Sequence, residues 1–234
     1  MDAGTDILRI DALRYRWPGA DALTLDIDSM SLGAGQRLFL RGPSGSGKST
    51  LLAAIAGAVD VAPGTVTVAG IDVGKLSGAA RDRFRVDHLG IIFQQFNLLT
   101  WLSAIDNVLL PCRFSASRRE RAGPDPEASA RRLLAELGLT DASLLDAQAG
   151  RLSVGQQQRV AAARALIGAP ALVLADEPTS ALDDAARDDF IRLLMTECET
   201  VGAALLFVSH DRDLERHFDR VLELGDLHQE SAPC

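Results

Sequence analysis

Apolar and polar residues alternate in two stretches near the N-terminus, residues 7–15 and 22–32. Such alternation predicts strands with one buried face, and Trp17-Pro18-Gly19 between the stretches predicts a turn. We therefore expect an antiparallel pair of strands that caps one edge of a sheet. A second pair of short strands is predicted over residues 65–68 and from Ile71 to Val73.

Continuous apolar runs without alternation occur further along the chain. Such a run is typical of a parallel strand that is covered on both faces. Helical segments are expected between these runs, so the order of elements predicts an α/β fold with a doubly wound sheet. The expected strands are residues 36–40, 88–93, 171–175 and 203–208, and the expected helices are residues 49–58, 81–87 and 184–200.

The pattern changes to helical periodicity between residues 96 and 163, as in residues 128–137 with apolar Leu133, Leu134 and Leu137. We interpret residues 96–163 as a helical subdomain inserted into an α/β core. Residues 1–95 and 164–234 would form that core, and residues 1–234 a single domain.

An arginine-rich run, residues 113–121, lies within the expected insertion and precedes the helix breaker Gly123-Pro124-Asp125-Pro126. Clustered like charges usually face water, so the favoured interpretation is a solvated connection. A contact surface for a partner is the alternative.

The composition is that of a folded domain, with 47% hydrophobic and 24% charged residues among 234. The net charge of −8 argues against a general affinity for nucleic acid, because binding its phosphates requires an excess of Lys and Arg. Cys112, Cys198 and Cys234 are far apart, so neither a disulfide framework nor a metal site is expected.

The N-terminus carries no recognisable signal, since residues 1–6 contain neither a basic stretch nor an apolar one. No apolar run approaches the roughly 18 residues that a membrane span needs. We therefore expect a cytoplasmic protein that lies on the inner face of the cell membrane only through a partner.

Residues 42–50 match the phosphate-loop pattern G-x-x-x-x-G-K-[ST] and stand between a predicted strand and a predicted helix, as this loop requires. Glycines let backbone N–H groups face phosphate oxygens, and the start of the helix adds a partial positive charge. Lys48 is placed to reach the β- and γ-phosphates, and Ser49 to ligate the Mg²⁺ that bridges them. The loop consists of Gly42, Pro43, Ser44, Gly45, Ser46, Gly47, Lys48, Ser49 and Thr50.

Two adjacent carboxylates, Asp176 and Glu177, follow the apolar run at residues 171–175. Ligands of α/β sheets bind at the carboxyl ends of the strands, so both side chains are expected near the phosphate loop. Asp176 suits the Mg²⁺ shell, and Glu177 suits a general base for the water that attacks a γ-phosphate. Taken alone, such a pair could equally be a solvated strand end.

Together these motifs resemble those of the nucleotide-binding subunit of an ATP-binding cassette (ABC) transporter. Leu152-Ser153-Val154-Gly155-Gln156 is similar to the family's signature L-S-G-G-Q, and residues 176–183 match its strand-end carboxylates and D-loop. His210 matches the switch histidine, and Gln94 matches the Q-loop. The resemblance covers nearly the whole chain. It implies a P-loop NTPase core with an antiparallel edge subdomain, and ATP and Mg²⁺ as cofactors.

The resemblance also implies how two chains share their nucleotides. Ser153, Gly155 and Gln156 would contact the γ-phosphate of ATP held by the other protomer, and Asp183 of the D-loop is placed among the nucleotide-binding residues. Two chains would therefore dimerise head to tail around two molecules of Mg-ATP, as a homodimer or a heterodimer.

Three further roles follow from the resemblance. His210 would hold the γ-phosphate and the attacking water, and Gln94 would sense the Mg²⁺, with Gln95 as the alternative if the register differs by one. Trp17 would stack on adenine, a position that it fits better than Tyr15. Glu177, His210 and Gln94 are thus the expected catalytic residues.

Val154 departs from the signature, which has Gly there in most members. A β-branched residue stiffens the start of a helix, so it could weaken closure of the dimer. Ser153 and Gly155 are retained, and we expect the phosphate contacts to form.

Residues 93–99 and 102–108 are similar to ATPases that serve lipoprotein-release and macrolide-export permeases and to the cell-division ABC ATPase. This predicts a motor for an integral membrane permease of few spans, working in export, lipoprotein release or mechanotransmission. A solute importer, which would dock on an apolar groove near Phe96, Leu98 and Leu99, is the alternative within the family. A soluble ABC ATPase acting on DNA or ribosomes, and a nucleotide kinase, are weaker alternatives. The sequence does not specify the substrate, its direction of transport or the permease.

Overall fold

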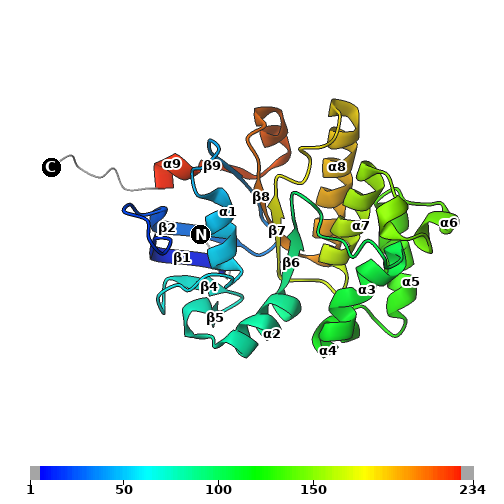
Figure 1. Ribbon diagram of the computed structural model, residues 1–234, viewed down its shortest axis with the longest axis horizontal. Helices are drawn as coiled ribbons and strands as arrows, with labels where there is room; N and C mark the ends of the chain where they lie inside the picture. The colour runs from blue at the N-terminus through cyan, green and yellow to red at the C-terminus, as the bar shows by residue number, and fades with distance from the viewer. Residues whose placement is uncertain (1–5, 228–234) are drawn as a thin grey trace.

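The structure, a computed structural model, describes residues 6–227. It contains two sheets, with helices packed around the central one and the sheet of the N-terminal strands at the left of the view (Figure 1). The strands are β1 (Asp6–Tyr15), β2 (Leu25–Gly33), β3 (Arg37–Arg41), β4 (Val66–Val68), β5 (Ile71–Asp72), β6 (Leu89–Ile92), β7 (Leu172–Asp176), β8 (Ala204–Val208) and β9 (Arg220–Glu223). The α-helices are α1 (Lys48–Ile55), α2 (Gly78–His88), α3 (Ala104–Phe114), α4 (Ala116–Arg121), α5 (Pro126–Glu136), α6 (Ala142–Leu145), α7 (Val154–Leu166), α8 (Asp184–Val201) and α9 (Leu224–Leu227). The 3-10 helices are η1 (Val73–Lys75), η2 (Ala149–Arg151) and η3 (Arg212–His217).

The central sheet is parallel, with the strand order β6-β7-β8-β3-β9. Its inner strands β7 and β8 are buried along almost their whole length, as their continuous apolar sequences predict. The chain leaves β3 and returns through β6 and β7 to β8, so strands distant in the sequence become neighbours. The predicted α/β fold with a doubly wound sheet is confirmed.

Side chains alternate between the two faces of this sheet and build two separate cores. Phe39, Val173 and Phe207 belong to the core that α7 and α8 cover. Leu40 and Leu206 belong to the other core, which lies against α1 and the second sheet. Because successive residues of a strand point to opposite faces, one apolar run supplies both cores.

The N-terminal strands form a sheet of their own, in the order β2-β1-β4-β5. The antiparallel pairing of β1 with β2 is as predicted, but the pair does not cap an edge of the central sheet. The buried residues of β1 and β2 share one core with α1 and with one face of the central sheet, because one face of each strand is apolar. Val73 was expected in a strand and instead begins η1, where the Asp72 side chain accepts from the Gly74 N–H.

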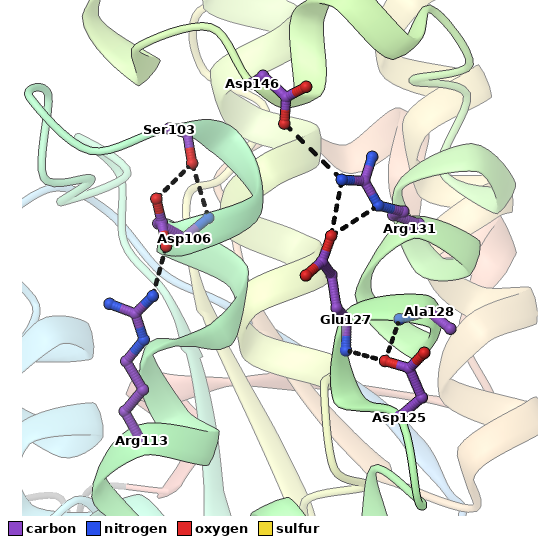
Figure 2. A network of polar contacts seen from close by, with 8 residues as sticks. All are labelled: Ser103, Asp106, Arg113, Asp125, Glu127, Ala128, Arg131 and Asp146. Atoms are coloured by element: carbon purple, nitrogen blue, oxygen red, sulfur yellow. Dashed lines mark hydrogen bonds and ion pairs between the residues drawn. The ribbon is translucent and has the colours of Figure 1, made fainter.

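Helices α3 to α7 occupy residues 104–166, at the right of Figure 1. Local signals start two of them, as Figure 2 shows. Ser103 Oγ accepts from the Asp106 N–H at 3.0 Å and caps α3. Asp125 Oδ1 accepts from the N–H groups of Glu127 and Ala128 at 3.1 and 3.0 Å and caps α5. Each cap satisfies N–H groups that the helix itself leaves unpaired.

Ion pairs then tie these helices along their exposed faces (Figure 2). Arg131 lies one turn after Glu127 and contacts it at 2.7 Å, and it also reaches Asp146, just after α6, at 3.7 Å. Arg113 pairs with Asp106 along α3. Helix α7 ends at Leu166 and therefore crosses the boundary expected at residue 163.

The arginine-rich run is not a solvated connection throughout. It forms the end of α3 and α4, and Arg118 is fully buried. Its guanidinium donates to the carbonyls of Leu89 and Ala165 at 3.3 and 2.8 Å. Burial lowers the pKa of Arg118 to about 10. The prediction of a solvated run was wrong for Arg118. It considered only the charge of the run, whereas carbonyls at the start of β6 and near the end of α7 accept hydrogen bonds from this buried guanidinium.

Cys112 and Cys198 are free and buried, and Cys234 lies outside the described residues. Burial raises the pKa of both thiols, that of Cys198 to about 12. Within residues 6–227, no helix combines the length and the apolar character needed to cross a bilayer.

Candidate functional site

The phosphate loop leaves the end of β3 and enters α1, as its pattern predicts. Gly45 and Gly47 adopt φ angles of +80° and +100°, which strain any residue with a Cβ. A Cβ on Gly47 would also lie 2.8 Å from the Thr24 carbonyl oxygen. Both glycines are therefore required by the backbone path, and the first turn of α1 points its unpaired N–H groups into the loop.

Lys48 is buried beneath this loop, with 7% of its surface exposed. Its Nζ donates to the carbonyls of Gly42 and Pro43 at 2.7 and 2.9 Å, and lies 4.0 Å from Glu177 Oε1. Ser46 Oγ is buried without a hydrogen-bond partner in the described part of the chain. The loop thus gathers a cation and spare donors around one point, as an anion site requires.

Asp176 and Glu177 lie at the carboxyl end of β7, opposite the loop. Ser49 Oγ donates to Asp176 Oδ2 at 2.9 Å, so these side chains meet as expected. Burial raises the pKa of Asp176, with Glu177 as a further cause. A carboxylate in this position favours a nearby cation.

Glu177 has a φ angle of +43°, an uncommon value for a residue with a side chain. Its N–H donates to the Val208 carbonyl at 2.9 Å, which fixes this turn to the end of β8. His210 follows β8, and its Nδ1 lies 3.1 Å from Glu177 Oε2. Neighbouring parallel strands therefore deliver an acid–base pair to one edge of the sheet.

A cavity of about 460 Å³ opens between these elements. Trp17 lines it, is 45% exposed, and donates from Nε1 to Thr50 Oγ1 at 3.3 Å. Tyr15 packs against Trp17 edge to face, at 5.3 Å between ring centroids. The lining is Trp17, Thr24, Ser44, Gly45, Gly47, Lys48, Ser49, Thr50, Gln94, Asp176 and Glu177.

Gln94 is on the cavity wall and Gln95 is not, so the structure favours the first of the two registers. The chain turns sharply after them, since Phe96 and Asn97 have φ angles of +58° and +49°. Arg164 of α7 donates to both of their carbonyls at 2.6 Å. Sequence analysis missed Arg164 and Thr24, because neither carries a local pattern that marks it.

The signature residues stand apart from this cavity. Ser153 caps α7 and forms a capping box with Gln156, whose side chain accepts from the Ser153 N–H at 2.8 Å. Ser153 and Val154 are exposed, and a Cβ on Gly155 would meet Leu182 at 3.8 Å. Asp183 also lies outside the cavity wall and caps α8 by accepting from the Ala186 N–H at 2.9 Å. The four predicted site residues Ser153, Gly155, Gln156 and Asp183 thus lie outside the cavity of their own chain. Ser153, Gln156 and Asp183 take part in helix caps there.

Comparison with known proteins decides the family. The sequence model of the ABC transporter family matches residues 25–180. The chain belongs to the ABC transporter family. The predicted class, an ATP-binding ATPase, is thereby confirmed.

Curated relatives of this ABC cassette include two kinds of transporter component. The lipoprotein-releasing system ATP-binding protein LolD of Novosphingobium aromaticivorans is 40% identical over 227 residues, covering 94% of this chain and 96% of LolD. The macrolide export ATP-binding/permease protein MacB of Burkholderia cenocepacia is 39% identical over 223 residues. The chain spans only 32% of the length of that MacB.

A solved structure of the ATP-binding cassette MJ0796 shares the fold. It is dimeric, represents a post-hydrolysis state, and holds ADP and Pi. The TM-score is 0.76 at 31% identity, and the match covers 95% of this chain and 96% of that one. The predicted P-loop NTPase architecture is confirmed by this neighbour.

The ABC cassette has a second, larger hollow of about 650 Å³ between α2, β6 and α3. Its apolar wall includes Ile91, Phe93, Leu110 and Phe114, and Phe114 is 71% exposed. This hollow lies beside the stretch where a groove was expected, since Phe93 and Asn97 are on its wall, but Phe96, Leu98 and Leu99 do not line it. Phe96 is buried and Leu98 packs against the core, because the turn after β6 directs them inward.

Proposed function

We propose that the chain is the ATP-binding and hydrolysing motor subunit of a transporter, and that it drives a separate membrane permease of few spans. The observation that carries this proposal is the match to the lipoprotein-releasing system ATP-binding protein LolD, which covers 94% of this chain and 96% of LolD. The cavity that joins the phosphate loop to Asp176, Glu177 and Gln94 supports it.

We propose further that two chains bind head to tail around two ATP molecules. The exposed signature residues at the start of α7 support this, because they do not reach the cavity of their own chain. A helix start offers N–H groups and a positive dipole end, which suit a γ-phosphate presented by a second chain. The dimeric state of the MJ0796 cassette is consistent with this assembly.

The proposed chemistry assigns tasks to Lys48, Trp17 and Glu177 on the cavity wall and to His210 beside Glu177. Lys48, now held by two loop carbonyls, would exchange one of them for phosphate oxygens, and Trp17 would stack on adenine. Glu177 would accept a proton from the attacking water, and His210 would hold Glu177 and the γ-phosphate in line. Separating the base from its orienting partner would therefore slow hydrolysis without weakening nucleotide binding.

Mg²⁺ fits the oxygen-rich side of the cavity. Ser49, Asp176 and Gln94 offer a hydroxyl, a carboxylate and an amide oxygen, the donors that Mg²⁺ prefers. No group of three or more His, Cys, Asp or Glu side chains suited to a metal occurs within residues 6–227. The ion would thus depend on phosphates and water for its other ligands, and it would neutralise charge that develops on the phosphates.

The permease is proposed to dock on the groove between α2, β6 and α3. This would place the chain at the cytoplasmic face of the membrane, with residues 1–95 and 164–234 as the ATPase core and residues 96–163 as the subdomain that bears part of the groove. Phe114 is large, exposed and apolar on this wall, as a contact residue for a partner would be.

A pull-down from detergent-solubilised membranes tests this proposal. Tagged Glu177→Gln chain with ATP should recover a few-span permease, and a Phe114→Asp, Glu177→Gln chain should recover much less while still binding ATP. Mass spectrometry identifies what is recovered. Recovery of a many-span permease, or of soluble proteins alone, would contradict the proposed branch.

A further inference from the structure

Arg187 lies at the end of the first turn of α8, outside the predicted motifs. Its side chain is only 16% exposed, and its Nη1 lies 2.5 Å from Asp211 Oδ2. Asp211 directly follows His210 in the chain. The ion pair therefore anchors the backbone next to the histidine that contacts Glu177.

Asp211 is itself held from both sides. Its Oδ1 accepts from the Asp213 N–H at 3.0 Å and caps η3, and its own N–H donates to Ser209 Oγ at 3.1 Å. Arg187 then ties the residue next to His210 directly to α8, while the Arg216–Asp188 pair ties η3 to α8 further along the chain.

The Arg187–Asp211 and His210–Glu177 contacts link two segments of the chain into a ring. One segment runs from Glu177 through the cap at Asp183 to Arg187 in α8. The other consists of Asp211 and the adjacent His210, which contacts Glu177. The ring surrounds a cavity of about 140 Å³ whose wall includes Glu177, Arg187, His210 and Asp211. Arg187 Nε faces no hydrogen-bond partner in the described part of the chain.

We propose that Arg187 is a positioning residue for hydrolysis, which holds His210 against Glu177 through Asp211. This inference rests on the roles proposed for Glu177 and His210. Arg187 touches no part of the nucleotide cavity, so it acts on turnover and not on nucleotide affinity.

Steady-state ATPase kinetics test the inference with a pair of matched variants. Arg187→Ala should lower kcat by roughly tenfold to a hundredfold, the range for a small misplacement of a reacting group, with KM and the Kd for ATP within about twofold of wild type. Asp211→Asn keeps the oxygen that caps η3 and should lower kcat equally, while Arg187→Lys should restore part of it. Arg216→Ala is the control, because the exposed Arg216–Asp188 pair also joins η3 to α8, at 2.7 Å, and should leave kcat unchanged.

A double-mutant cycle shows whether Arg187 acts through His210. Adding Arg187→Ala to His210→Ala should lower single-turnover hydrolysis no further. An equal loss in both backgrounds, or a kcat for both Arg187→Ala and Asp211→Asn within twofold of wild type, would overturn the inference. If Glu177→Gln and His210→Ala themselves keep wild-type turnover, the proposed function fails first and the inference with it. If the Glu177 and His210 variants lose turnover but the Arg187 and Asp211 variants keep the wild-type kcat, the inference fails and the proposed function stands.

Discussion

Lys48 makes the most specific contribution of any single residue to the cavity. It is one of two lysines in a chain whose other basic side chains, the histidines apart, are arginines, and it is the buried one. Its compact ammonium donates to two carbonyls of the loop, and a planar guanidinium would present its donors in a different geometry.

Replacement of Lys48 by Ala should weaken ATP binding about a hundredfold, since hydrogen bonds to a charged group contribute roughly 1.5–3 kcal/mol. Isothermal titration with ATP measures the change. Lys75→Ala is the control, because Lys75 is 71% exposed and pairs only with Asp72 in the described structure. An unchanged affinity in the Lys48 variant would contradict the assignment of the loop.

Val154 tests how much of the signature the chain needs. Val154 is 47% exposed, and the capping box between Ser153 and Gln156 forms without its side chain. Val154→Gly should therefore change turnover by less than tenfold, or under about 1.4 kcal/mol of barrier. Phosphate-release assays measure it, and a complete loss of activity would refute the prediction.

At the scale of elements, a buried acid joins α5 to α8. Glu197 of α8 is 4% exposed and lies 3.8 Å from Arg132 Nη1, and Arg132 also pairs with Glu136 of α5. Burial, followed by Glu136, raises the pKa of Glu197 to about 7, while Arg132 opposes the rise. Cys198, with a pKa of about 12, stays neutral beside it. The folded protein therefore holds this proton to a higher pH than the unfolded chain does.

The free energy of unfolding should fall as pH rises. Below the unfolded pKa of Glu, roughly 4.5, the stabilisation from protonated Glu197 is complete, and it is lost as pH passes through about 7. Glu197→Gln should remove about 1 kcal/mol of the difference in stability between pH 6 and pH 8. Urea unfolding at both pH values measures this, with exposed Glu199→Gln as the control. The same pH dependence in wild type and Glu197→Gln would be evidence against a protonated Glu197.

Elements could be predicted well where one local pattern decides them. The continuous apolar runs predicted the buried strands β7 and β8. The glycines before Lys48 predicted the phosphate loop, because that backbone path needs residues without a Cβ. The family resemblance implied the antiparallel N-terminal subdomain, but the residue pattern alone did not predict that it forms a separate sheet, because alternation in β1 shows that one face is buried but not against what. Arg118 and Arg187 were missed for a related reason, since their carbonyl and carboxylate partners come from elements distant in the sequence.

At the scale of the whole molecule, the cavity and the signature residues lie apart on one chain. The loop and carboxylates line the cavity, while Ser153 caps an exposed helix start. Under the proposed function these are the two halves of a shared site. Two copies facing each other would complete two sites at once. This division explains why ATP binding and dimerisation are expected to be one event.

The mass of the Glu177→Gln chain in solution, with and without Mg-ATP, tests that claim most directly. Light scattering after gel filtration should give 24.9 kDa without nucleotide and twice that mass with it, because the closed dimer forms and is hydrolysed very slowly. A Ser153→Arg, Glu177→Gln chain should bind ATP yet keep the single-chain mass, since its signature cannot reach the second site. A Glu177→Gln chain that binds Mg-ATP and stays at 24.9 kDa would contradict the account.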